Sequence, residues 1–142
     1  MKTLTGLGVL VVATTVALMV PASVNAAEED AVPTFTKDIA PIFQAKCEAC
    51  HRPGSIAPMS LVTYQESRPW ARSIKQRTGL RNRLGVMPPW YIEKDIGIQD
   101  FKGDVSLSDM DVEKIATWVD NGAPRGNPAD MPEPLRFLDE LV

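Results

Sequence analysis

The sequence predicts a single all-α domain with long loops, and three observations support this prediction. Apolar residues recur at helical spacing in two separate stretches, one near position 40 and one near position 115. Start and stop signals typical of helices flank these stretches. No stretch reads persuasively as a strand, and the chain contains no internal repeat.

The first predicted helix leads into the most informative part of the chain. Four apolar residues fall at positions i, i+4, i+7 and i+8, on one helix face: Phe35, Ile39, Ile42 and Phe43. Thr34 or Thr36 would cap the start of this helix. The helix runs straight into Cys47, so the cysteine motif would lie on the last turn of an amphipathic helix.

Two short helices are predicted between positions 63 and 79. Thr63 and Glu66 match a capping box, which marks the start of the first of them. A proline at position 69 is unfavourable inside a helix but favourable in a first turn, so we expect a break there and a second helix over 69–78. Trp70 and Ile74 would face the core.

The last helix has the clearest boundaries. Ser108 is a good N-cap, and Gly122 is typical of the residue that follows a helix. The predicted buried stripe consists of Val112, Ile115, Ala116 and Val119, with Trp118 at its flank. Residues 80–105 lack helical periodicity and should form an ordered but irregular loop.

The first 26 residues are predicted to be a secretion signal. Lys2 gives the positive start, residues 4–20 are mostly apolar, and residues 24–26 fit a signal-peptidase site. We expect cleavage near Ala26 and a periplasmic protein. The alternative is an uncleaved anchor, and only then would the protein associate with a membrane. The mature chain would comprise a flexible leader (27–33), one domain (34–124) and a proline-rich tail packed on its surface (125–142).

The charge of the mature chain limits its partners. Without Lys2, 14 basic and 18 acidic side chains remain, which gives a net charge of −4 and does not suggest a nucleic-acid-binding protein. Six basic residues nevertheless fall within 68–83, with no acidic residue among them. They would form either an ordinary solvated helix face or a docking surface for an acidic partner.

Both cysteines of the chain and its only histidine lie within the five residues CEACH, as Cys47, Cys50 and His51. Two thiols at this spacing on a helical turn can reach the two vinyl groups of one porphyrin, and the next residue can place its imidazole under the iron. The motif therefore predicts one covalently bound haem c per chain, with His51 as the proximal iron ligand.

Other uses of the two cysteines explain the motif less well. A thioredoxin-like redox pair has the same spacing but expects a βαβ context, which is missing here. A closed zinc site needs four ligands, usually Cys or His, and the chain has only three such residues. A plain disulfide could form after export, but it gives His51 no role.

The distal iron ligand cannot be a second histidine of the same chain. Four methionines of the mature chain are candidates: Met59, Met87, Met110 and Met131. Met59 follows His51 closely, which is short for a chain that must travel around the haem edge. Met87 has a longer approach and is followed by two prolines that would stiffen it. We expect Met87 as the distal ligand, with Met59 as the alternative, and an open sixth position as a further option.

Three stretches together resemble a known family: "FTKDIAPIFQAKCEACHRPGSIAPMSL", "MPPW" and "LSDMDVEKIATWVDNGAP". Their order is similar to that of class I cytochromes c. It resembles more specifically the bacterial monohaem cytochrome domains that occur alone or fused to thioredoxin-like or copper-monooxygenase modules. The resemblance covers most of the mature chain. It implies about four helices around a haem crevice, electron transfer, and packing of Phe43 on the last helix.

A haem iron with both axial positions filled passes single electrons and leaves little room for a substrate. We therefore expect a periplasmic one-electron carrier that serves redox partner proteins and is not itself an enzyme. Two alternatives remain at this stage. One is a gas-binding or catalytic haem protein with an open sixth site, and the other is an obligate electron-transfer subunit of a dehydrogenase or monooxygenase complex.

Overall fold

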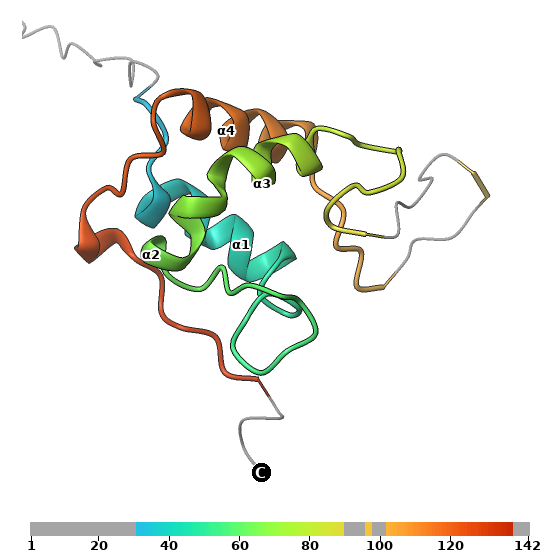
Figure 1. Ribbon diagram of the computed structural model, residues 1–142, viewed down its shortest axis with the longest axis horizontal. Helices are drawn as coiled ribbons and strands as arrows, with labels where there is room; N and C mark the ends of the chain where they lie inside the picture. The colour runs from blue at the N-terminus through green and yellow to red at the C-terminus, as the bar shows by residue number, and fades with distance from the viewer. Residues whose placement is uncertain (1–30, 90–95, 98–101, 138–142) are drawn as a thin grey trace, which may run out of the picture.

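Figure 1 shows the computed structural model of the chain, which describes residues 31–89, 96–97 and 102–137. Every regular element in these residues is helical, so the predicted all-α class is confirmed for them. In chain order the elements are the π-helix η1 (Phe35–Ile39), the α-helices α1 (Ala40–Lys46) and α2 (Tyr64–Ser67), the 3₁₀-helix η2 (Arg68–Trp70), the α-helices α3 (Ala71–Thr78) and α4 (Asp109–Asp120), and the 3₁₀-helix η3 (Pro128–Asp130).

Two sequence predictions fall largely outside the described residues. These are the signal peptide at 1–26 and most of the irregular segment between positions 90 and 101. None of the described helices combines the length and the apolar character of a membrane-spanning segment.

The first helix begins as a π-helix and continues as α1 without a break, because the Ala40 amide donates to the Phe35 carbonyl. Thr34 precedes the helix with an extended backbone, but its side chain accepts no capping hydrogen bond. The carboxylate of Asp38 instead accepts from the Thr34 amide at 2.8 Å. Thr36 lies inside η1 and is buried, so of the two predicted caps only Thr34 stands at the helix start.

The predicted break between two short helices is confirmed. Thr63 and Glu66 form the capping box that starts α2, and η2 separates α2 from α3. Ile74 is buried, as predicted, but Trp70 is 44% exposed, so its predicted inward orientation is wrong. Ala71 and Ile74 occupy the buried face of α3, and Trp70 stands one residue before that face begins.

The predicted boundaries of the last helix are confirmed. Ser108 forms a capping box with Asp111, and Gly122 follows the C-cap Asn121 with a φ of +85°, a conformation that favours glycine. The predicted buried stripe is partly wrong, because Trp118 is completely buried at its centre together with Ile115. The other stripe residues are only partly buried: Val112, Ala116 and Val119.

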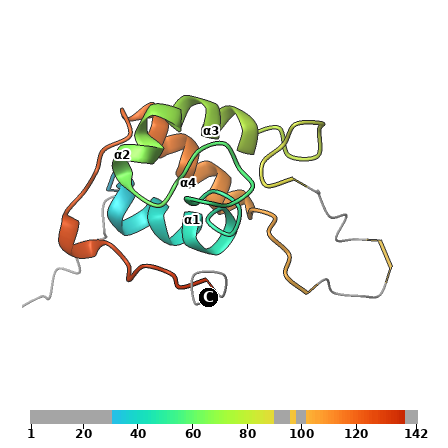
Figure 2. The same cartoon turned by 60° about the horizontal axis from the view of Figure 1, so that its bottom comes forward.

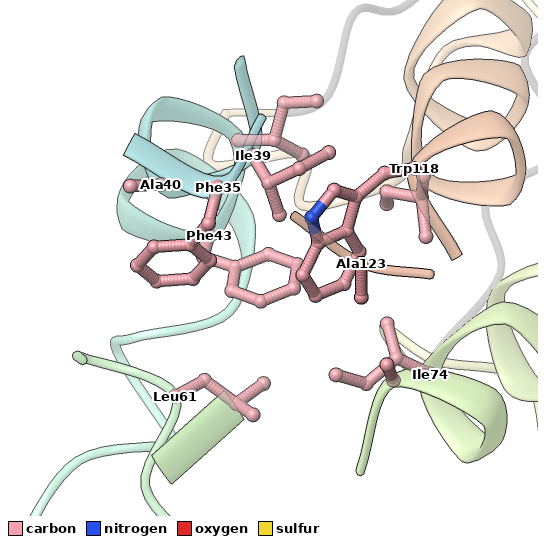
Figure 3. Packing of buried hydrophobic residues seen from close by; sticks show 11 residues of the cluster. Phe35, Ile39, Ala40, Phe43, Leu61, Ile74, Trp118 and Ala123 are labelled. Atoms are coloured by element: carbon pink, nitrogen blue, oxygen red, sulfur yellow. The ribbon is translucent and has the colours of Figure 1, made fainter. Parts of the chain in front are cut away.

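The core forms where aromatic rings from η1, α1 and α4 meet (Figure 3). The Trp118 ring lies 6.4 Å from that of Phe43 in an edge-to-face arrangement, and 6.2 Å from that of Phe35. Its indole nitrogen donates to the Pro124 carbonyl at 3.0 Å, so the polar atom of this buried side chain is satisfied. The expected contact between Phe43 and the last helix is therefore present.

The segment after α4 returns to the first helix. The amides of Phe35 and Thr36 donate to the carbonyls of Pro124 and Arg125 at 2.9 and 3.0 Å. The following residues run along the outside of η1 and α1, where Figure 2 shows them in red. This return joins the first and last parts of the domain directly.

Candidate functional site

The CEACH motif forms a tight turn at the end of α1. Cys47 is the C-cap residue, and its carbonyl accepts from the amides of Cys50 at 3.1 Å and His51 at 2.9 Å. The motif therefore lies in a hydrogen-bonded turn directly after α1, which ends at Lys46, and not on the last turn of the helix as the sequence predicted. This turn brings both thiols and the imidazole to one end of the helix.

The loop after the motif fixes the orientation of the His51 ring. Nδ1 of His51 lies 3.1 Å from the carbonyl oxygen of Met59, which can only accept, so Nδ1 carries the proton. The Nε2 lone pair is then available for a metal, an arrangement typical of metal-binding histidines. The Leu61 amide closes the loop by donating to the His51 carbonyl at 2.9 Å. Nothing in the sequence indicates this use of the Met59 backbone.

The thiol chemistry of Cys47 is unlike that of a redox cysteine. Both cysteines are free, with no disulfide between them. Burial, and after it the nearby Glu48 and Cys50, raise the pKa of Cys47 to about 12. Cys47 also stands at the negative end of a helix, whereas reactive thiolates are stabilised at helix N-termini. The structure thus gives no support to a thioredoxin-like redox pair.

Glu48, between the two cysteines, is almost fully buried, with 2% of its surface exposed. Burial, and after it the nearby charge of Glu66, raise the pKa of its carboxyl group from 4.5 to about 7. Glu66 behaves differently. Partial burial would raise its pKa, but hydrogen bonds from Thr63 and Ser60 outweigh this effect and lower it. Sequence reasoning missed Glu48, since a charged residue on an exposed-looking last turn gives no sign of burial.

The buried Glu48 predicts a pH-dependent stability. The folded state holds its proton more tightly than the unfolded chain does, so Glu48 destabilises the fold progressively as the pH rises from about 4.5 to about 7. Glu48→Gln should therefore be more stable than the wild type at pH 8, by about 1–3 kcal/mol, and equal to it near pH 4. Urea unfolding across this pH range measures the difference.

The exposed Glu133 provides the control for this experiment, because Glu133→Gln removes the same charge from the surface. Its stability should follow the wild type at every pH. Parallel pH profiles for Glu48→Gln and the wild type would contradict the assigned role of Glu48.

Met87 stands at the end of a loop that folds back on α3. Its amide donates to the Arg77 carbonyl at 3.2 Å, and its side chain is 41% exposed. Among the described residues no hydrogen bond joins this loop to the motif turn. Met59 and Met131 pack against the core, whereas Met110 is 76% exposed on α4.

The motif turn and the Met87 loop nevertheless lie toward the same end of the helical bundle. Figures 1 and 2 both show the C-terminal ends of α1 and α3 at this end, beside the start of α4. Lys46 supports this arrangement, because its ammonium group donates to the carbonyl of Asp104, shortly before α4, at 2.9 Å. The loops also carry exposed apolar side chains: Ile56, Leu84 and Met87.

The residues at this end fit a covalently bound haem in their donor chemistry. Two free thiols stand three positions apart on one turn, and the next residue offers an imidazole whose tautomer leaves Nε2 unprotonated. The exposed apolar side chains of the two flanking loops suit the apolar faces of a porphyrin. Cys47, Cys50 and His51 would hold the group on one side, and Met87 is the candidate ligand from the other loop.

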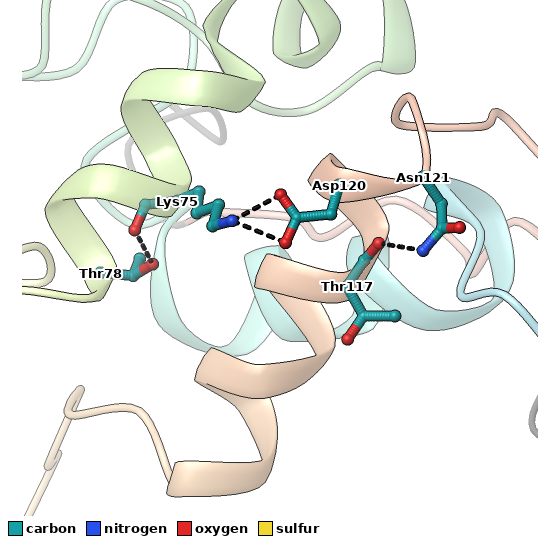
Figure 4. A network of polar contacts seen from close by, with 5 residues as sticks. All are labelled: Lys75, Thr78, Thr117, Asp120 and Asn121. Atoms are coloured by element: carbon teal, nitrogen blue, oxygen red, sulfur yellow. Dashed lines mark hydrogen bonds and ion pairs between the residues drawn. The ribbon is translucent and has the colours of Figure 1, made fainter.

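Half of the basic side chains in the stretch 68–83 have partners within the chain. Lys75 pairs with Asp120 of α4 at 2.6 Å (Figure 4), and Arg81 pairs with Asp109. Arg77 donates to the carbonyl of Gly85 at 3.3 Å. Three of the six side chains thus stabilise the fold, and the exposed arginines that remain within the stretch are Arg68, Arg72 and Arg83.

Comparisons of the chain with protein-family models, with curated proteins and with solved structures found no match.

Proposed function

We propose that this protein is a one-electron carrier with a single haem c, attached through Cys47 and Cys50 and ligated by His51. The observation that carries the proposal is the hydrogen bond from His51 Nδ1 to the Met59 carbonyl, on the turn that holds both free thiols. It presents Nε2 as a metal ligand at the position that haem attachment requires. When bound, the haem supplies a metal that changes its oxidation state by one electron.

The residues of this chain have separate tasks in the proposed function. Cys47 and Cys50 keep the group from dissociating, which matters for an exported protein. The Met59 carbonyl orients the His51 ring and increases its basicity as a ligand. No general base or activated nucleophile is needed, so we propose no catalytic activity.

Met87 is the proposed distal ligand, and the position of Met59 supports this choice. The Met59 carbonyl bonds to Nδ1, on the edge of the imidazole away from Nε2, and its side chain packs against the core. With its carbonyl bonded to His51 and its side chain packed against the core, Met59 is poorly placed to bind the iron from the opposite side of a haem. Met87 lies on a different loop, where its amide donates to the Arg77 carbonyl, and its side chain is exposed enough for the thioether to reach a metal.

The proposed location is the periplasm, after cleavage of the leader near Ala26, and the proposed partners are other redox proteins. The second candidate function is a haem protein with an open sixth site. The 41% exposure of Met87 favours it, together with the absence, among the described residues, of a hydrogen bond from its loop to the motif turn, because a loosely held distal ligand can be displaced. Addition of carbon monoxide to the reduced protein separates the two, since a filled sixth position gives no immediate change in the absorption spectrum.

Intact-mass measurement of the exported protein tests the proposal. The mass should exceed that of the mature chain by one haem, because thioether bonds survive denaturation. Acid–acetone extraction should leave the colour with the polypeptide. A mass equal to the bare chain, or to the chain less two hydrogens for a disulfide, would contradict the proposal. Cys47→Ala combined with Cys50→Ala is the control and should yield a colourless chain after extraction.

A further inference from the structure

The tail after α4 reaches the loop that follows the haem-attachment motif. Figure 2 shows it running from the end of α4, past η3 and below η1 and α1. Met131 packs against the core, and the Gln44 side chain of α1 donates to the Glu133 carbonyl at 2.9 Å. The ring of Phe137 then lies 4.2 Å from the guanidinium carbon of Arg52. The last of these contacts falls on the residue directly after His51.

The loop that Phe137 contacts has little support of its own. Between His51 and Leu61, the residue that reaches full burial is Leu61 at the far end. Gly54 takes a φ of +75° at the tip, and Ile56 is 88% exposed. Two backbone hydrogen bonds, from Ala57 to Cys50 and from Leu61 to His51, close the loop. Within the loop, residues 52–58 are exposed or only partly buried, whereas Met59, whose carbonyl orients the imidazole, packs its side chain against the core.

Arg52 connects the tail to the orientation of His51. Its guanidinium carbon lies over the Phe137 ring, at a distance typical of a cation–π contact, and its Nε atom is buried. An arginine stacked on an aromatic ring is held more firmly than one in solvent. Arg52 directly follows His51 in the chain, so a movement of the Arg52 backbone would also move the His51 ring. Holding Arg52 in place therefore limits the ways in which the imidazole could lose its orientation.

We propose that the tail is a clamp on the metal-ligand loop, in which Phe137 and Arg52 are positioning residues that keep His51 bonded to the Met59 carbonyl. Only one consequence of the clamp, a stronger bond between His51 and iron, rests on the proposed function. The orientation of the imidazole itself can be measured whether or not haem is attached. Failure of the clamp and failure of haem attachment are therefore distinguishable.

The test compares Phe137→Ala with the wild type in the full chain labelled with ¹⁵N. The first readout is the tautomer of His51 from its ring nitrogen shifts, and the second is hydrogen exchange of the Leu61 amide, which bonds to the His51 carbonyl. Loss of a cation–π contact should speed Leu61 exchange roughly three- to tenfold and reduce the fraction of His51 with a protonated Nδ1.

Three further variants make the result decisive. Phe137→Tyr keeps the ring and should restore wild-type values, and Leu135→Ala, an exposed neighbour on the same tail, should change neither readout. Arg52→Lys weakens the same contact by changing its other partner. It should have the same effect as Phe137→Ala, because lysine lacks the planar stacking group. Unchanged Leu61 exchange in Phe137→Ala would overturn the proposal. So would an equal increase at every amide, which reports only a less stable domain.

Discussion

Replacement of Met87 by alanine should lower the reduction potential of the haem-bound protein by an amount on the order of hundreds of millivolts. A thioether accepts electron density from iron and favours the ferrous state, so its loss favours the ferric state. Axial ligand identity shifts haem potentials across a range of about 0.8 V, which makes this the largest electronic effect available from one side chain. Spectroelectrochemical titration measures the potential.

The same variant should change two spectra. The weak far-red band that reports sulfur–iron ligation in the ferric protein should disappear, and the reduced protein should bind carbon monoxide rapidly. Met59→Ala is the matched control, because the substitution removes the same side chain but leaves the backbone carbonyl that bonds to His51. If the band survives in Met87→Ala and disappears in Met59→Ala, then the loop after His51 supplies the distal ligand.

Replacement of Trp118 by alanine should destabilise the fold by about 3–5 kcal/mol. The indole is completely buried against the rings of Phe35 and Phe43, and its removal leaves a large cavity. It also removes the hydrogen bond from the indole nitrogen to the Pro124 carbonyl at 3.0 Å, although the Phe35 amide still donates to that carbonyl. Because each kcal/mol lost shifts the unfolding midpoint of a small domain by about 4–8 °C, the midpoint should fall by more than about 10 °C.

Trp70→Ala is the matched control for this experiment, since it makes the same chemical change at a side chain that is 44% exposed. Its effect should stay near or below about 1 kcal/mol. Thermal unfolding followed by circular dichroism measures both variants. Equal losses of stability would mean that the burial of the two tryptophans does not determine their contributions.

The helices of this chain were predictable wherever a local signal sets their ends. Ser108 and Gly122 bound α4 through side-chain and backbone chemistry within a few residues, and Thr63 starts α2 in the same way. The π-helical start at Phe35 was not predictable, because its first residues are held by Pro124 and Arg125 from the other end of the domain. A sequence window contains no information about such a partner.

The errors at the two tryptophans have a common cause. Helical periodicity fixes which residues share a face, but it does not say where the centre of the buried face lies. In α4 the aromatic partners of Trp118 come from the first helix, so the buried face centres on Trp118 and Ile115. In α3 the 3₁₀ turn before Ala71 places Trp70 outside the buried face.

The sequence predicted the residues of the candidate site, but not the contacts that hold them in place. The spacing of the two cysteines and the histidine is the signal for Cys47, Cys50 and His51, and the structure places all three on one turn. The Met59 carbonyl could not be predicted, since every residue has a carbonyl and only the folded loop selects one. The burial of Glu48 likewise depends on elements distant in sequence, α2 among them, because Glu66 of that helix acts on its pKa.

The pairing of η1 with the segment after α4 also determines the order in which this domain can assemble. The hydrogen bonds from Phe35 to Pro124 and from Thr36 to Arg125 cannot form until nearly the whole domain has been synthesised. Contacts between distant parts of a chain form slowly, because a long loop must close before they contribute. Cys47 would therefore remain reachable on a still-open chain, although folding later buries much of it. That interval is the time in which an enzyme could modify both thiols.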